Sequence, residues 1–170
     1  TTDTDQIALL DIGDQAIVSD CKFYGDNPQA AVLLDRDNRI DSADFAWHFE
    51  NCEFTSGTET TTSDAGATHG DAFTTVGILY DNNVTSNELY VSDCRFKNWF
   101  TGLGINNGQI VNIEGSTFTN VLSGIRTEGA SSSKVYISRN SFYVSPANGA
   151  CIHFGVANTT ATDYSYVTHN

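Results

Sequence analysis

Val91-Ser92-Asp93-Cys94-Arg95-Phe96 is one copy of a segment that occurs six times in this chain. The other copies occupy residues 18–23, 49–54, 113–118, 137–142 and, cut short, 167–170. The fourth residue of each copy falls at 21, 52, 94, 116, 140 and 170, so the steps are 31, 42, 22, 24 and 30 residues. A shortest step near 22, lengthened elsewhere by insertions, is typical of a β-solenoid, in which every coil keeps its strands and only the loops vary.

Apolar residues alternate with polar ones through each copy, which is the period-two pattern of β-strands. Aligned copies give three columns that we expect to face inward. The columns are Ala16, Trp47, Leu89, Val111, Val135 and Ser165; Val18, Phe49, Val91, Ile113, Ile137 and Val167; and Phe23, Phe54, Phe96, Phe118 and Phe142. Parallel strands repeat at about 4.8 Å, so the five Phe side chains should form an aromatic stack inside the solenoid.

A second strand is predicted in each coil, beginning at a branched apolar residue. The expected first residues are Val32, Ile78, Ile105, Ile125 and Ile152. A small residue precedes each of them, namely Ala31, Gly77, Gly104, Gly124 and Cys151, as expected at a tight corner between two sheets. With two prolines and no helical periodicity, the pattern predicts an all-β parallel β-helix of about five to six coils.

The four cysteines fit into this repeat. Cys21, Cys52 and Cys94 share a column with Ser116, Asn140 and Asn170, which predicts stacked small residues at a turn, and Cys151 lies in the corner column. Structural thiols are the favoured interpretation; a disulfide between adjacent coils is the alternative, although parallel stacking gives poor bridging geometry. No pair has the short spacing of a zinc site, so no metal site is predicted from the cysteines.

Charge limits the choice of partners. Acidic residues outnumber basic ones by 21 to 8, giving a net charge of −13, which repels nucleic-acid backbones and anionic membrane surfaces. We therefore expect no nucleic-acid partner and no membrane insertion. The many Thr, Ser, Asn and Gly residues suit a halophilic or extracellular setting as well as an ordinary acidic β-protein. The chain has no Met and stops within a repeat, so we expect residues 1–170 to be one β-helix segment that continues beyond both ends.

The repeated segment, the Phe column and the Cys/Ser/Asn column resemble the right-handed parallel β-helix of the pectate-lyase-like superfamily over residues 16–170. That superfamily includes polysaccharide lyases and hydrolases and the tailspikes and fibres of viruses. The resemblance implies a polysaccharide or surface glycan as partner, an extracellular or virion-surface location, and a homotrimer. The same fold carries many activities, so function has to be argued from particular residues.

Two rows of side chains should point outward from the first strand. One row contains His48, Tyr90, Asn112, Tyr136 and Tyr166, and the next contains Glu50 and Glu114. Aromatic rings beside carboxylates predict a carbohydrate-binding stripe, since rings stack on apolar sugar faces and carboxylates accept hydroxyl hydrogen bonds. The alternative is a solvated strand face. Glu50 and Glu114 lie two coils apart, roughly 10 Å, near the carboxyl separation of an inverting glycosidase.

A second set of candidate catalytic residues comes from the second strand, where Asp35, Asp81 and Arg126 are expected to point outward. Asp35 and Asp81 should lie about 5 Å apart on adjacent coils, which a shared proton, a Ca²⁺ ion or retaining-type catalysis would explain. Arg126, beside His153 and Glu128, would suit a polysaccharide lyase that removes a proton next to a uronate carboxylate. A surface ion pair is the favoured alternative. Apart from Ca²⁺, no cofactor is predicted.

The longest insertion is expected at residues 55–75, where Asp64, His69 and Asp71 occur in a Thr-, Ser- and Gly-rich loop that would wall a groove or touch a neighbouring chain. Asn83 and Asn158 begin glycan-acceptor motifs. Three functions fit these features. The first is a spike or fibre module that binds cell-surface polysaccharide, the second is a polysaccharide lyase or glycoside hydrolase, and the third is a structural spacer.

Overall fold

All regular structure in the computed structural model is β-strand, within the residues that it describes. These are residues 8–12, 15–25, 30–35, 46–57, 75–81, 87–106, 110–128, 134–144, 149–154 and 164–170. A search of the same residues for a helix long and apolar enough to cross a bilayer finds none. The predicted all-β class is confirmed.

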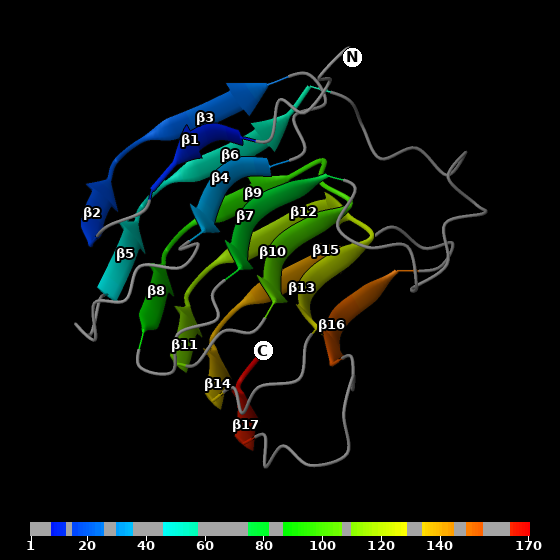
Figure 1. Ribbon diagram of the computed structural model, residues 1–170. Coiled ribbons are helices and arrows are strands. Elements are labelled where there is room, and N and C mark those ends of the chain that lie inside the picture. Colours follow the sequence, from blue (N-terminus) through cyan, green and yellow to red (C-terminus); the bar gives the residue numbers. More distant parts are fainter. Residues whose placement is uncertain are drawn as a thin grey trace.

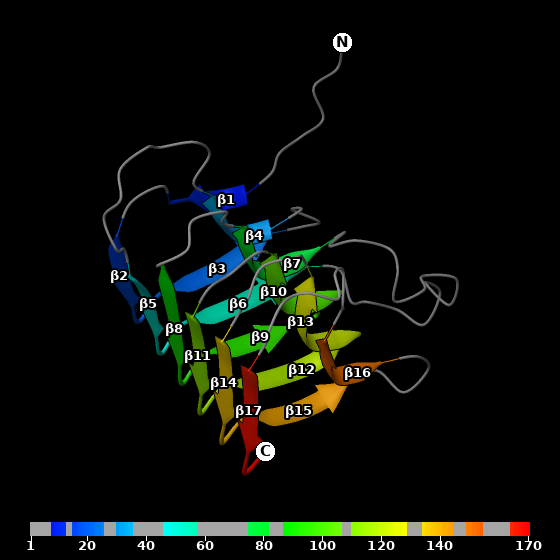
Figure 2. The same ribbon diagram turned by 60° about the horizontal axis from the view of Figure 1, so that its bottom comes forward.

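The strands form three parallel sheets, and each sheet extends along the axis of the solenoid (Figures 1 and 2). Sheet A contains β1 (Ala8–Asp11), β4 (Ala30–Asp35), β7 (Val76–Asp81), β10 (Thr101–Asn106), β13 (Ser123–Glu128) and β16 (Ala150–Phe154). Sheet B contains β2 (Ala16–Ser19), β5 (Ala46–Glu50), β8 (Glu88–Ser92), β11 (Ile110–Glu114), β14 (Lys134–Ser138) and β17 (Tyr164–Thr168). Sheet C contains β3 (Lys22–Gly25), β6 (Glu53–Ser56), β9 (Arg95–Lys97), β12 (Thr117–Val121) and β15 (Ser141–Val144).

Each coil passes from sheet B through a short turn to sheet C and then to sheet A, so it has three strands where the sequence predicted two. The repeated segment is divided at its third residue, which has a positive φ between 50° and 64° in every copy. These residues are Asp20, Asn51, Asp93, Gly115, Arg139 and His169. Gly, Asn and Asp reach this left-handed conformation at little cost, which explains why they fill four of the six positions.

The Phe column forms the predicted stack. Ring centroids of Phe23, Phe54, Phe96, Phe118 and Phe142 follow one another at 5.0, 4.9, 4.8 and 5.0 Å, with interplanar angles of 3° to 10°. The register of sheet B aligns the other two predicted columns as well; Trp47 pairs with Leu89, for example, and Phe49 with Val91. Burial of these columns makes one continuous apolar core along the solenoid.

The corner between sheets C and A needs glycine because the Phe stack presses against it. A Cβ on Gly102 would lie 2.5 Å from Phe118 Cδ1 and 2.7 Å from the carbonyl oxygen of Gly124. Gly77 and Gly124 meet Phe96 and Phe142 in the same way.

The prediction was wrong in one coil. Leu103, not Ile105, aligns with Ile78 and Ile125, so Gly102 is the corner residue and Gly104 is not. The segment Gly102-Leu103-Gly104-Ile105 offers two Gly–apolar pairs two residues apart, and only the contact with Phe118 distinguishes them.

The turn between sheets B and C is held by a ladder of small side chains. Asn140 Oδ1 accepts from the Ser116 N–H at 2.8 Å, and Asn170 Oδ1 accepts from the Asn140 N–H at 2.9 Å. The Asn140 Nδ2 donates to Ile113 O and Ser138 O, both at 3.0 Å.

Cysteine thiols make the equivalent hydrogen bonds in the earlier coils. Cys94 Sγ donates to Phe49 O at 3.5 Å and to Ser92 O at 3.3 Å, and Cys52 Sγ donates to Val18 O and Glu50 O. All four cysteines are free thiols, which is the interpretation favoured from sequence. Burial raises the pKa of the Cys94 thiol to about 12 and also raises that of Cys52, so both remain protonated and unreactive near neutral pH.

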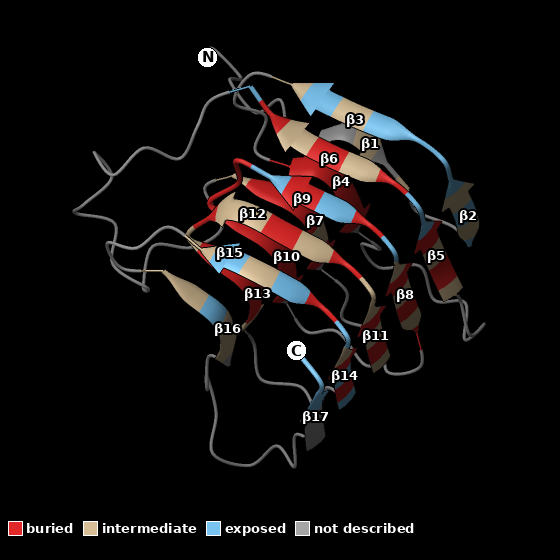
Figure 3. Cartoon of the chain, turned by 180° about the vertical axis from the view of Figure 1, so that it is seen from behind, coloured by how far each residue is buried: buried red, intermediate tan, exposed pale blue. Residues whose placement is uncertain are grey.

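Sheet A differs from the other two because its four middle strands, β4, β7, β10 and β13, are buried on both faces, as their almost continuous red shows in Figure 3. Arg126 is therefore only 1% exposed. The prediction that Arg126 belongs to an outward surface ion pair was wrong, because strand alternation reports which way a side chain points and not what lies over it.

The predicted insertion begins later than expected, since Thr55 and Ser56 belong to β6. Asp64, His69, Asp71, Asn83 and Asn158 lie outside the described residues.

Candidate functional site

The outer face of sheet B carries two neighbouring rows of side chains in strict register. The aromatic row consists of Ile17, His48, Tyr90, Asn112, Tyr136 and Tyr166. The carboxylate row consists of Ser19, Glu50, Ser92, Glu114, Ser138 and Thr168. Their partners on alternate positions fill the core, so the alternation of each strand fixes which residues face outward.

His48 and Tyr90 form the centre of the aromatic row. Their rings are stacked, with centroids 4.5 Å apart and planes inclined by 8°. Both side chains are half-buried, because each ring covers one face of the other. This pair forms an aromatic ridge across coils two and three.

Glu88 fixes the orientation of the Tyr90 ring. The Tyr90 hydroxyl donates a hydrogen bond to Glu88 Oε2. This bond raises the pKa of Tyr90 above its usual value, with smaller contributions from partial burial and from the negative charge of Glu88. The phenol therefore stays neutral, and its hydroxyl group is held by the Glu88 carboxylate.

The row changes character at Asn112, where an amide replaces a ring between Tyr90 and Tyr136. Two coils of about 4.8 Å separate these tyrosines, so the ring-bearing positions on either side of Asn112 lie roughly 10 Å apart. Tyr136 is 38% exposed. Asn112 thus places an amide, which can donate and accept hydrogen bonds, between two aromatic residues of the row. Backbone register places Tyr166 beside Tyr136.

In the carboxylate row, Glu50 and Glu114 are both in register with Ser92 and lie two coils apart, as predicted. Glu50 is exposed, and Glu114 forms an ion pair with the exposed Arg139. A general acid in a glycosidase depends on burial that keeps its carboxyl protonated, and neither residue has that environment. Glu50 and Glu114 are therefore better suited to accept hydrogen bonds from a ligand than to act as an acid–base pair.

The remaining predicted catalytic residues lie on sheet A. Asp35 and Asp81 pair directly on adjacent strands, and the same position continues with Asn106 and Glu128. The register that motivated a shared proton or a Ca²⁺ ion is thus confirmed, while their side chains lie outside the described part of the structure.

Arg126 pairs with His153. The buried Arg126 is remote from the exposed rows of sheet B, so the structure does not bring the two catalytic sets into one site. Where side chains are described, His, Cys, Asp and Glu nowhere form a group of three suited to holding a metal ion.

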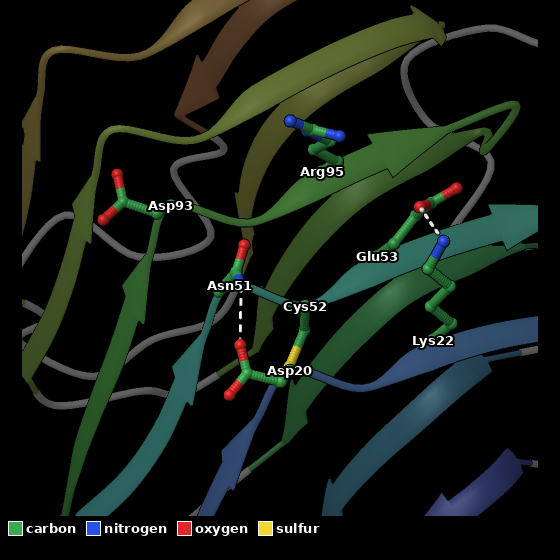
Figure 4. A pocket seen from close by; sticks show the side chains of 7 residues that line it. All are labelled: Asp20, Lys22, Asn51, Cys52, Glu53, Asp93 and Arg95. Atoms are coloured by element: carbon green, nitrogen blue, oxygen red, sulfur yellow. Dashed lines mark hydrogen bonds and ion pairs between the residues drawn. The ribbon is translucent and has the colours of Figure 1, made fainter.

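Sequence reasoning missed a hollow at the turn between sheets B and C (Figure 4). Its lining includes Asp20, Lys22, Asn51, Glu53, Asp93 and Arg95, with Cys52 beneath them. The signal was present in the repeated segment, since its third and fifth residues are charged or amide side chains in the first three copies and become mostly small or uncharged afterwards. We call this hollow the turn pocket.

A three-sheet parallel solenoid with an aromatic and acidic strand face defines the chain as a parallel β-helix protein. Residues 7–163 match the family described as right handed beta helix region, and the chain belongs to that family. The match confirms the predicted fold and its handedness. No curated protein and no solved structure matches the chain.

Proposed function

We propose that this β-helix binds a polysaccharide on a cell surface through the outer face of sheet B, as part of an extracellular or virion-surface spike or fibre. The observation that carries the proposal is the stacked pair of His48 and Tyr90, followed along the same row by Asn112 and Tyr136. Exposed aromatic rings bind the apolar faces of sugar rings, and neighbouring acceptors bind their hydroxyl groups. A repeating ligand suits a surface whose rows repeat at about 4.8 Å.

Stiffness supports the same function. The four central residues of the aromatic row, His48, Tyr90, Asn112 and Tyr136, each lie between two inward neighbours that belong to the apolar core, as Tyr90 does between Leu89 and Val91. A ligand that binds there meets side chains already held in place, so little conformational entropy is lost on binding. Trimeric assembly stays a prediction of the resemblance.

Retention of the protein on immobilised polysaccharides tests this proposal. We expect at least one member of a panel of acidic and neutral polysaccharides to retain the protein, and Tyr90→Ala or Tyr136→Ala to weaken its affinity about fivefold or more. Tyr143→Ala is the matched control, because Tyr143 is a 64% exposed tyrosine on sheet C. Equal retention of all three variants would overturn the assignment of the aromatic row.

The same incubation tests the enzymatic alternative. Chain shortening and the absorbance of unsaturated products are followed together with retention. Binding without cleavage agrees with the proposal. Cleavage that disappears in Glu50→Gln, Glu114→Gln or Asp81→Asn would instead identify a hydrolase or lyase.

A further inference from the structure

Three of the four cysteines, Cys21, Cys52 and Cys94, form one column at the turn between sheets B and C. They lie 31 and 42 residues apart in the sequence, a spacing that predicted no metal site. The fold nevertheless places them on consecutive coils, because strands β3, β6 and β9, which begin immediately after them, pair in register. The column therefore brings together thiols that the sequence keeps apart.

The three thiols point the same way. Each Sγ donates to the carbonyl oxygen of the residue two positions earlier, at 3.2 Å for Cys21 and at 3.3 Å for Cys52 and Cys94. Cys52 and Cys94 also each donate to a carbonyl group of the preceding coil, at 3.4 and 3.5 Å. These two carbonyl groups belong to Val18 and Phe49, which are register partners in sheet B. Since equivalent side chains repeat with the strands, we expect adjacent sulfur atoms about 4.8 Å apart.

A separation of this size suits a metal ion held between two sulfur atoms. A metal–thiolate bond is about 2.3 Å long, so a linear sulfur–metal–sulfur unit spans about 4.6 Å. A disulfide bond, at about 2.05 Å, is much shorter. A zinc site needs four ligands, whereas the described residues contain no group of three His, Cys, Asp and Glu side chains around one point. Thiolates prefer soft ions, of which Cu(I) accepts two ligands.

We propose that Cys21 and Cys52 bind one soft monovalent cation of the Cu(I) class between their sulfur atoms. Each thiol releases its proton to solvent as its bond to the metal forms, and no electron is transferred. The inference goes beyond polysaccharide binding and is independent of it, because the cysteine column lies at the turn and contributes nothing to the two rows on sheet B.

Access and charge favour this pair over the next one along the column. Cys21 is exposed, and Cys52 lines the turn pocket, so an ion can reach both sulfur atoms (Figure 4). The pocket lining carries three acidic and two basic side chains, which favours a cation. Cys94 is buried, and this burial raises its pKa to about 12, so its proton is harder to displace.

The binding equilibrium should depend on pH. Burial raises the pKa of the Cys52 thiol, whereas a hydrogen bond from the backbone of Cys21 lowers it. A cation that binds Cys52 must therefore displace a proton, and it supplies the positive charge that the buried thiolate lacks. Since two protons leave for each ion bound, the affinity should fall up to about a hundredfold for each unit by which the pH decreases.

Anaerobic titration of the protein with Cu(I), in competition with a chromophoric Cu(I) chelator, tests the site. We expect one tightly bound Cu(I) per chain, the same behaviour with Ag(I), and much weaker binding of Zn(II). Cys21→Ser and Cys52→Ser should each weaken Cu(I) binding by more than about a hundredfold, because one of two metal bonds is lost. Copper K-edge absorption should show two sulfur neighbours in a linear arrangement.

Cys151→Ser is the matched control, because it removes an exposed thiol outside the column, and Cys94→Ser removes the next thiol within it. Both variants should keep the affinity for Cu(I). Serine is a suitable replacement within the column, since Ser116 already occupies it. Equal affinity for Zn(II), unchanged binding in Cys21→Ser, or loss of binding in Cys94→Ser would overturn the inference. So would an increase in the sedimentation coefficient with Cu(I), which would mean that the ion links two copies of the chain.

Discussion

The Phe stack and the aromatic row are built from the same repeated strands but follow opposite rules. Inside, five coils carry the same residue, and the rings lie 4.8–5.0 Å apart in nearly parallel planes. Outside, the corresponding positions change from Ile17 to His48, Tyr90, Asn112 and Tyr136. Uniformity within the core reflects a packing constraint that every coil shares, while variety on the surface leaves each coil free to serve a ligand.

Truncation of a ring in the stack should have the largest effect on stability. Phe118 is fully buried between Phe96 and Phe142. Phe118→Ala removes both ring contacts and leaves a cavity, so we expect the free energy of unfolding to fall by about 3–5 kcal/mol in urea titrations. Thr119→Ala, one residue along β12 and half-exposed, should change it by no more than about 0.5 kcal/mol. Similar losses for both variants would contradict the inside–outside division.

A methyl group added at the corner should be the next most damaging change. Gly102→Ala forces a Cβ against Phe118 and the Gly124 carbonyl, with an expected loss of about 1–3 kcal/mol. Because the ring is one of the two obstacles, Phe118→Leu should reduce that loss when the two changes are combined. A double-mutant cycle in urea measures the coupling, and strictly additive effects would show that Phe118 is not what excludes a side chain at position 102.

These interior features were largely predictable from sequence because each recurs at a fixed place in the repeat. The Phe column and the turn ladder needed only alignment of the copies. The register at Gly102 was missed because two glycines two residues apart satisfy the same pattern. The burial of Arg126 was missed because it depends on what covers sheet A.

The outer site was predictable only as a row of residue types. Sequence placed His48 and Tyr90 side by side, but the 8° ring stack and the bond from Tyr90 to Glu88 depend on side-chain rotamers. Glu88 and Arg95 were not recognised from sequence, because a single charged residue on an outward position is usually only solvated. The register of the turn was needed to bring Arg95, Asn51 and Asp93 around one hollow.

Alkaline pH should separate the buried thiols from the exposed ones. The pKa of Cys94 is about 12 in the folded protein against an ordinary value of 9.0, because burial disfavours the thiolate. The unfolded chain therefore loses this proton first, and stability falls as the pH rises from about 9 towards 12. Serine already occupies the same column one coil later, at Ser116. Cys94→Ser should therefore be tolerated and should reduce the dependence of stability on pH, measured by urea titrations at several pH values.

Cys151→Ser is the control for this measurement, since Cys151 is exposed and its replacement should leave the slope unchanged. A thiol reagent at pH 8 should accordingly modify Cys21 and Cys151 in the folded protein and all four cysteines after unfolding. Rapid labelling of Cys94 in the folded state would contradict its place in the core.

A change at Glu88, beside the aromatic row, should alter the stability least, and its effect should appear in the titration of Tyr90. Glu88→Gln removes the charge that opposes ionisation of Tyr90 and weakens their hydrogen bond, so the pKa of Tyr90 should fall towards 10.0. Ultraviolet titration, with Tyr90→Phe to assign the signal, measures this shift, and the free energy of unfolding should change by less than about 0.5 kcal/mol. An unchanged Tyr90 titration would mean that Glu88 does not orient the ring, and the ridge that carries the proposed sugar contact would then lose its fixed geometry.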